Sequence, residues 1–117
     1  MDVHQPATTL SILHLEDSAN DHRLACRVLD KSRFQYTIRR VETLSAFTDA
    51  ALSGAFDLVL ADYRLAGFTA VDAWTSLPTN CLRPPFILLS GAIGEAAAVS
   101  AIQLGISDYL HKDDLGQ

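Results

Sequence analysis

Several short apolar runs in this chain end in polar residues whose side chains could act together. Glu16 and Asp17 follow the first such run, Asp62 and Ser90 follow two later ones, and Lys112 follows the last. Three carboxylates held close together repel one another unless a cation stands between them. Two or three acids with open positions suit Mg²⁺ better than a full calcium cage. A metal and a lysine facing a carboxylate would stabilise a transferring phosphoryl group, which a carboxylate can accept as an aspartyl phosphate.

The elements that must position these residues follow from the spacing of apolar residues. Strands are predicted over 10–15, 36–41, 58–61, 86–89 and 108–111, and helices over 20–32, 43–53, 69–77 and 96–104. The strand over 36–41 has mixed polarity, which suits the edge of a sheet. The strands over 10–15, 58–61 and 86–89 are predominantly apolar and do not alternate strictly, as in a parallel sheet buried on both faces. The alternation therefore predicts an α/β, doubly wound, five-stranded parallel sheet.

The carboxyl ends of parallel strands lie along one edge of such a sheet, and ligands bind there at the switch point of strand order. At any single strand, a polar residue can simply mark where the chain leaves the core. Here, functional groups from four separate segments fall on the same edge, which that simpler interpretation does not explain. We therefore predict one crevice that contains all of them.

Composition excludes several other classes of protein. The 117 residues suffice for one domain, and the formal net charge of -5 with no basic patch argues against direct binding of nucleic acid. No run approaches the roughly 18 apolar residues of a membrane span, so no membrane association is expected. Cys26 and Cys81 lie in no evident metal-ligand or redox spacing, which predicts reduced thiols and a cytoplasmic protein.

The histidines offer no zinc site by this interpretation. His14 is expected to be a packed, hydrogen-bonded residue in the middle of a strand, whereas His22 and His111 are expected to be exposed. Because no His or Cys pair is recognised at ligand spacing, zinc is disfavoured. Trp74, on the third predicted helix, is expected to serve packing.

Four runs carry a resemblance to a known family. They are Leu15-Glu16-Asp17-Ser18, Leu60-Ala61-Asp62-Tyr63-Arg64-Leu65, Leu89-Ser90-Gly91-Ala92 and Asp108-Tyr109-Leu110-His111-Lys112. In this order and spacing they resemble the receiver domains of response regulators in two-component signalling, of the chemotaxis-receiver type. The resemblance extends from about Leu10 to Asp114. It implies a flavodoxin-like strand order of 2-1-3-4-5, a receiver domain over residues 10–117 and an N-terminal tail over 1–9.

The resemblance also implies a role for each matching residue. Asp62 would accept the phosphoryl group, Asp17 would bind Mg²⁺ directly, and Glu16 would reach the ion through water. The backbone carbonyl of Arg64 would be a further metal ligand. The remaining matches are Lys112, which would bridge to the phosphoryl group, and Ser90 with Tyr109, which would form the switch.

The family further implies a signalling domain, not an enzyme, with a histidine kinase or a histidine phosphotransfer protein as its phosphodonor. Three positions depart from the common pattern: Asp113 replaces a proline after the lysine, Ala66 a proline after the acceptor, and Ala70 a glycine before the third helix. Only Gly116 and Gln117 follow the expected first turn of a fifth helix. We therefore expect that helix to be truncated, the chain to self-associate, and the native protein to continue into an output domain or a hybrid sensor kinase.

Other classes were weighed against the receiver. A haloacid-dehalogenase-type phosphatase would need an Asp where Arg64 stands, and a flavodoxin would need a Ser/Thr/Gly-rich phosphate loop in place of Glu16-Asp17. A stand-alone receiver and a pseudo-receiver used only for protein contacts remain open alternatives.

Overall fold

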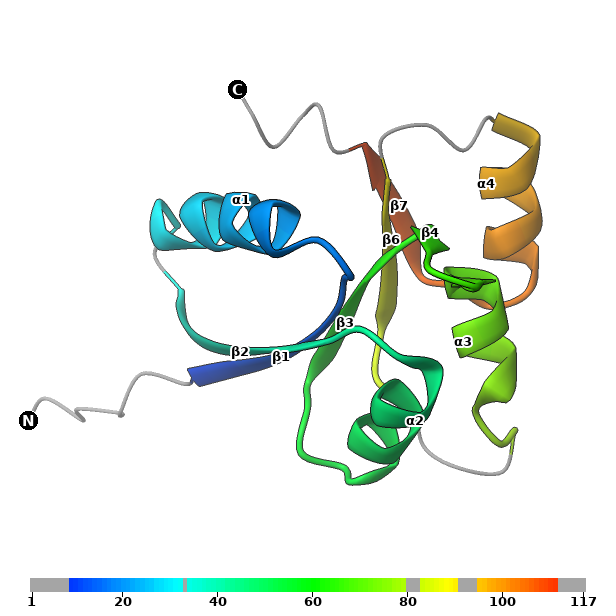
Figure 1. Ribbon diagram of the computed structural model, residues 1–117, viewed down its shortest axis with the longest axis horizontal. Helices are drawn as coiled ribbons and strands as arrows, with labels where there is room; N and C mark the ends of the chain where they lie inside the picture. Colours follow the sequence, from blue (N-terminus) through cyan, green and yellow to red (C-terminus); the bar gives the residue numbers. More distant parts are fainter. Residues whose placement is uncertain (1–8, 33, 80–82, 91–94, 112–117) are drawn as a thin grey trace, which may run out of the picture.

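The computed structural model describes residues 9–32, 34–79, 83–90 and 95–111 (Figure 1). The strands are β1 (Thr9–Leu15), β2 (Gln35–Val41), β3 (Leu58–Asp62), β4 (Arg64–Leu65), β5 (Phe68–Thr69), β6 (Phe86–Ser90) and β7 (Asp108–His111). The helices are α1 (Ala19–Asp30), α2 (Leu44–Leu52), α3 (Ala70–Ser76) and α4 (Glu95–Gln103). The five strands and four helices predicted over residues 10–111 are present, and each boundary falls within two residues of its predicted position. None of the described helices is long and apolar enough to cross a membrane.

Five strands form a parallel sheet in the order β2-β1-β3-β6-β7. This confirms the doubly wound, flavodoxin-like arrangement and places β2 at an edge, as its mixed polarity predicted. The chain leaves β1 toward β2 on one side and returns to β3 on the other. The switch point of strand order therefore lies between β1 and β3, where a doubly wound sheet opens a crevice at its carboxyl edge.

Hydroxyl side chains start three helices, beginning at or near that edge. Ser18 Oγ accepts a hydrogen bond from the N–H of Asp21 at 3.2 Å and begins α1. Thr43 caps α2, and Thr69 forms a capping box with Asp72 at the start of α3. Each cap satisfies a backbone donor that the first turn of a helix leaves without a partner. The loops next to the acidic residues are therefore short and well defined.

Helices lie on both sides of the sheet (Figure 1), and apolar side chains fill the space between the sheet and the helices on each side. On one side, Leu13, Val59 and Phe86 pack beneath α2, α3 and α4, and the ring of Phe86 meets those of Phe47 and Trp74 edge to face. On the other side, alternate residues such as Ile12 and Leu60 face α1. This period of two is the geometry of a strand whose two faces are both buried.

The α1 face is only partly covered by described residues. An apolar groove opens there, and Phe34 and Leu110 at its margin are 70% and 42% exposed. Its lining residues are Leu10, Ile12, Ala25, Val28, Leu29, Phe34, Leu58, Leu60, Ile87, Leu89 and Leu110. The predicted start of a fifth helix after β7 lies outside the described residues, so the truncated fifth helix stays a prediction.

One element was not predicted. β4 and β5 form a two-stranded antiparallel hairpin after Asp62, turning at Ala66 and Gly67. Gly67 has φ of +88°, a conformation that glycine adopts without steric cost. The hairpin folds back over the end of β3, and the N–H of Ala70 donates to the carbonyl of Tyr63 at 2.8 Å. It thereby forms one wall of the crevice.

Candidate functional site

Three carboxylates meet at the switch point. Glu16 directly follows β1, Asp17 is the next residue, and Asp62 is the last residue of β3. One oxygen from each lies within 4.8 Å of the others. Glu16 is fully buried, Asp62 is half-buried and Asp17 is exposed. An all-oxygen set with solvent on one side fits a hard divalent cation such as Mg²⁺, which keeps several of its own waters.

Glu16 is held at both its backbone and its side chain. Its N–H donates to the carbonyl of Val41 at 3.0 Å, which continues the pairing of β1 with β2. Its own carbonyl accepts from Arg40 at 3.2 Å, and its carboxylate accepts from the N–H of Ser18 at 3.3 Å. These contacts orient a buried acid toward the crevice and leave it little freedom to turn away.

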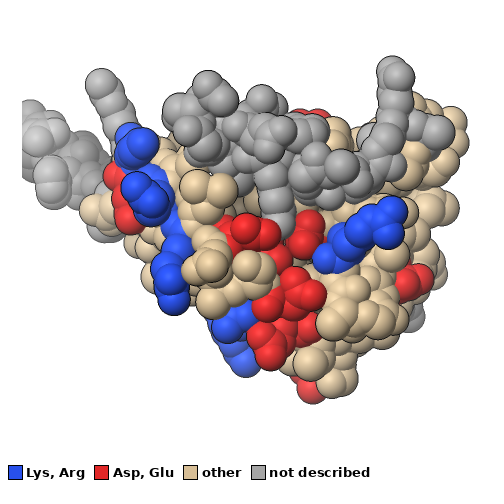
Figure 2. Space-filling model, turned by 45° about the horizontal axis from the view of Figure 1, so that its top comes forward, with Lys and Arg blue, Asp and Glu red and all other residues tan. Residues whose placement is uncertain are grey.

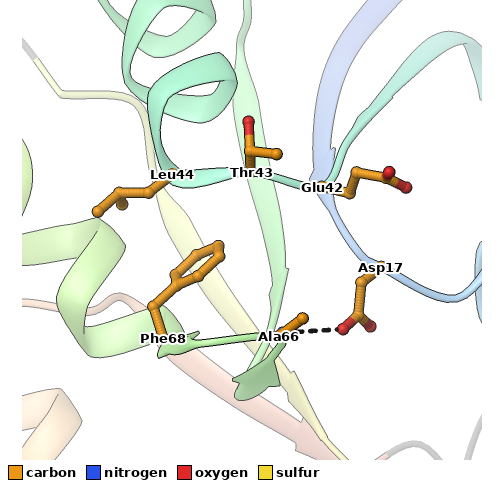
Figure 3. Close-up of a pocket in the computed structure, with 6 residues that line it drawn as sticks. All are labelled: Asp17, Glu42, Thr43, Leu44, Ala66 and Phe68. Carbon is orange, nitrogen blue, oxygen red and sulfur yellow. Dashed lines mark hydrogen bonds between the residues drawn. The ribbon is translucent and has the colours of Figure 1, made fainter.

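Asp17 connects two loops of the crevice. Its Oδ2 accepts a hydrogen bond from the N–H of Ala66 at 3.0 Å, which ties the β1–α1 loop to the turn of the β4–β5 hairpin (Figure 3). A pocket opens beside this bond, with Glu42 on the same side as Asp17 and Phe68 on the opposite wall (Figure 3). Asp17 therefore lies at the open mouth of the site.

Charge is unevenly distributed around the site. Figure 2 shows acidic side chains gathered in the middle of this face, with basic side chains on both sides of them. Arg40 forms an ion pair with Glu42 at 2.8 Å, so one nearby acid already has a cationic partner. A concentration of negative charge of this kind attracts a cation and repels a free phosphate ester unless a metal or a lysine offsets it.

The predicted site residues are described to different extents. Glu16, Asp17 and Asp62 are brought together as predicted. Ser90 ends β6 and pairs with His111 of β7, but its side chain is not described. The position of Lys112 lies outside the described residues. The roles assigned to these residues therefore remain predictions.

Tyr109 and Arg64 complete the predicted set. Tyr109 lies in β7, paired with Leu88, and its partly buried ring packs against the core. Arg64 is the first residue of β4, and its guanidinium carbon lies 5.9 Å from the ring centroid of Tyr63. The Arg64 side chain is exposed, while its backbone belongs to the hairpin.

The prediction that His22 is exposed was wrong. His22 is half-buried, and its Nδ1 lies 2.9 Å from Nδ1 of His14, while its Nε2 lies 3.6 Å from Sγ of Cys26. His14 is a fully buried, hydrogen-bonded strand residue, and Trp74 is a packed residue, as expected. The signal that sequence reasoning missed is the spacing of His22 and Cys26, because residues four apart share one face of a helix.

A family model described as "Response regulator receiver domain" matches residues 12–115. A comparison with curated proteins finds no match.

Three solved structures illustrate the likeness in fold. The Mn(2+)-bound form of response regulator Rcp1 has a TM-score of 0.73 and 24% identity, covering 91% of this chain and 86% of that chain. The phosphorylated cyanobacterial phytochrome response regulator RcpA has a TM-score of 0.75 and 21% identity, covering 92% and 86%. The BeF3-activated N-terminal receiver domain of RstA from Klebsiella pneumoniae has a TM-score of 0.72 and 22% identity, covering 87% and 85%.

Identities this low show a shared fold and nothing finer. The family model is more informative, because it matches nearly the whole chain, including the strand ends that bring Glu16, Asp17 and Asp62 together. This chain belongs to the response regulator receiver domain family, whose members are signalling domains.

Proposed function

We propose that this domain accepts a phosphoryl group on Asp62 in a Mg²⁺-dependent reaction, with a histidine kinase or a histidine phosphotransfer protein as donor. The observation that carries the proposal is the meeting of Glu16, Asp17 and Asp62, with one oxygen of each within 4.8 Å of the others. Asp62 stands at the end of the central strand β3, where the crevice opens. A phosphoryl donor can reach it from the same side as a metal ion.

In the proposed reaction, a carboxylate oxygen of Asp62 attacks the phosphorus atom of a phosphohistidine. An O–P bond forms as the N–P bond breaks, and the imidazole leaves and takes up a proton. Mg²⁺ held by Asp17, Asp62 and the backbone carbonyl of Arg64, with Glu16 acting through water, would offset the charge on the transferring oxygens. The protein contributes mainly positioning and electrostatic stabilisation.

Three residues would read the phosphorylated state. Lys112 offers a positive charge to the new dianion, and Ser90 offers a hydroxyl group. Movement of Ser90 toward the phosphoryl group would let Tyr109 turn inward. The surface of α4 and β7, the last strand of the sheet, would change as a result. That surface would pass the signal to an output domain or to another protein.

The solved structures named above support this chemistry by analogy. Their titles describe Rcp1 with Mn(2+) bound, RcpA as phosphorylated, and RstA as activated by BeF3. These states belong to those proteins. The present chain has the same fold and an acidic cluster at the edge where a doubly wound sheet binds its ligands.

The direct test is incubation with Mg²⁺ and acetyl phosphate, followed by intact-mass measurement. We expect the wild-type chain to gain one phosphoryl group, and both Asp62→Asn and a reaction without Mg²⁺ to gain none. Asp57→Asn is a matched control, because Asp57 precedes the same strand, β3, but lies at its opposite end. Labelling of Asp62→Asn equal to that of the wild type would overturn the assignment, and no labelling of the wild type by any donor would favour a pseudo-receiver.

A further inference from the structure

A second cluster of ligand-type side chains, His14, His22 and Cys26, lies between β1 and α1. His22 and Cys26 are one helical turn apart on α1, and both are half-buried. His22 Nε2 lies 3.6 Å from Cys26 Sγ. The two atoms therefore face each other at a place that solvent can reach.

His14 of β1 sets the orientation of the His22 ring. The two Nδ1 atoms are 2.9 Å apart, and the ring centroids are 5.1 Å apart. One Nδ1 must carry the hydrogen and the other must accept it. If His22 donates to the fully buried His14, the lone pair of His22 is on Nε2, the atom that faces Cys26. Ligating histidines commonly donate their second ring N–H in this way.

We propose that His22 Nε2 and Cys26 Sγ form a binding site for a borderline or soft transition-metal ion of the Zn²⁺ type, with His14 as a positioning residue. Tetrahedral zinc with Zn–N bonds of about 2.0 Å and Zn–S bonds of about 2.3 Å requires an N···S separation of about 3.5 Å. The observed separation is 3.6 Å, so an ion fits with little movement of either side chain. Water or a ligand from another molecule completes the coordination.

Local charges act on the two ligands in different ways. Burial, followed by the positive charges of Arg40 and Arg23, lowers the pKa of His22, which keeps its imidazole in the neutral form that binds metal. Burial and the charge of Asp30 raise the pKa of the Cys26 thiol. Binding therefore replaces the thiol proton with the metal ion and releases that proton to solvent.

The donor atoms separate this site from the carboxylate crevice. Glu16, Asp17 and Asp62 offer only oxygen atoms, which suit Mg²⁺, whereas imidazole and thiolate select Zn²⁺ and similar ions. The two sites should therefore fill independently. Failure of one would leave the other untouched, so the inference stands apart from the proposed phosphoryl transfer.

The test uses Co²⁺ as a spectroscopic substitute for Zn²⁺, in a Cys81→Ser background that leaves Cys26 as the sole thiol. We expect a thiolate-to-cobalt charge-transfer band that Zn²⁺ abolishes and excess Mg²⁺ leaves unchanged. The band should persist in Asp17→Asn and disappear in Cys26→Ser. His22→Gln should weaken Co²⁺ binding at least roughly tenfold, and His14→Phe should weaken it about 10- to 100-fold, the range seen when an outer partner of a ligand is lost.

Circular dichroism of each variant separates loss of the site from loss of the fold. A second measurement does not depend on the spectrum: Zn²⁺ should raise the melting temperature of the Cys81→Ser chain but not that of the folded Cys26→Ser/Cys81→Ser chain. Absence of the charge-transfer band in the Cys81→Ser chain would overturn the proposal. Unchanged affinity for Co²⁺ in folded His22→Gln would also overturn it, as would displacement of Co²⁺ from the site by Mg²⁺.

Discussion

At the residue scale, the acidic trio combines side chains in very different surroundings. Glu16 is fully buried and receives a hydrogen bond from Ser18, whereas Asp17 is exposed at the mouth of the crevice. Each carboxylate accepts one backbone hydrogen bond, from Ser18 and from Ala66 respectively, so the difference between them is burial. An exposed carboxylate can approach a hydrated ion from the solvent side more freely than a buried one. This difference agrees with the proposal that Asp17 binds Mg²⁺ directly and that Glu16 acts through water.

We predict that Asp17→Asn weakens Mg²⁺ binding by roughly tenfold or more, which corresponds to about 1.4 kcal/mol. The loss of Mg²⁺ affinity in Glu16→Gln should be several times smaller than the loss in Asp17→Asn. The Asn side chain can still accept the hydrogen bond from Ala66, so the loop should stay in place while the ligand loses its charge. Calorimetric titration of both variants with Mg²⁺ measures the difference. Equal losses would mean that Glu16 also contacts the ion directly.

At the scale of elements, the junction of α3 and α4 depends on one tryptophan. Trp74 on α3 donates its indole N–H to the carbonyl of Leu104 at 2.7 Å, just past the end of α4. A Cβ atom added to Gly105 would lie 2.9 Å from Cζ2 of Trp74, and Gly105 has φ of +106°. The close approach and the left-handed backbone both require glycine at this position.

We predict that Gly105→Ala lowers the free energy of unfolding by about 2–4 kcal/mol, because overpacking adds to backbone strain. Gly54→Ala is the matched control: its φ is +75°, but nothing lies within 4 Å of the added atom. It should cost only the backbone strain, about 1–2 kcal/mol. Urea unfolding of the two variants gives the comparison, and equal costs would show that the indole moves aside freely.

The same contact makes Trp74 a reporter for the proposed switch. It is the only tryptophan in the chain, and its hydrogen bond connects it to the segment that leads into β7. We predict that Mg²⁺ with beryllofluoride changes Trp74 fluorescence in the wild type, because movement of α4 and β7 would alter this contact. The change should be absent in Asp62→Asn. A wild-type spectrum that does not respond would confine the effect of phosphorylation to the crevice.

At the scale of the whole molecule, the described residues cover the two faces of the sheet unequally. Among the described helices, α2, α3 and α4 lie over one face of the sheet, and α1 lies over the other (Figure 1). Phe34 and Leu110 border the apolar groove beside α1. Exposed apolar surface of this extent favours association with another apolar surface. The groove is thus a candidate surface for contact between copies of the chain.

We predict that the 117-residue chain self-associates with rising concentration and that Phe34→Ser with Leu110→Ser reduces this association. Leu52→Ser is the control, because Leu52 is 48% exposed but lies outside the groove. Sedimentation velocity over a range of concentrations measures the effect. Association that persists in the double variant, or that Leu52→Ser abolishes, would place the contact elsewhere.

The sequence by itself determined the fold class and the location of the acidic site. Apolar runs and helical spacing are local signals, so β1, β3 and the four helices could be predicted to within two residues. Asp17 and Asp62 could be placed at one edge because parallel strands connected by helices must all point the same way. The order of the strands came from the family resemblance, and the sheet confirms it.

Only the tertiary structure decided the remaining features. The β4–β5 hairpin has two-residue strands, too short for a periodic signal, and the bond from Ala66 to Asp17 joins residues 49 positions apart. The spacing of His22 and Cys26 was visible in the sequence, but its meaning depends on His14, which reaches His22 only because α1 packs across β1. Contacts between elements depend on how the elements pack, and local spacing does not contain that information.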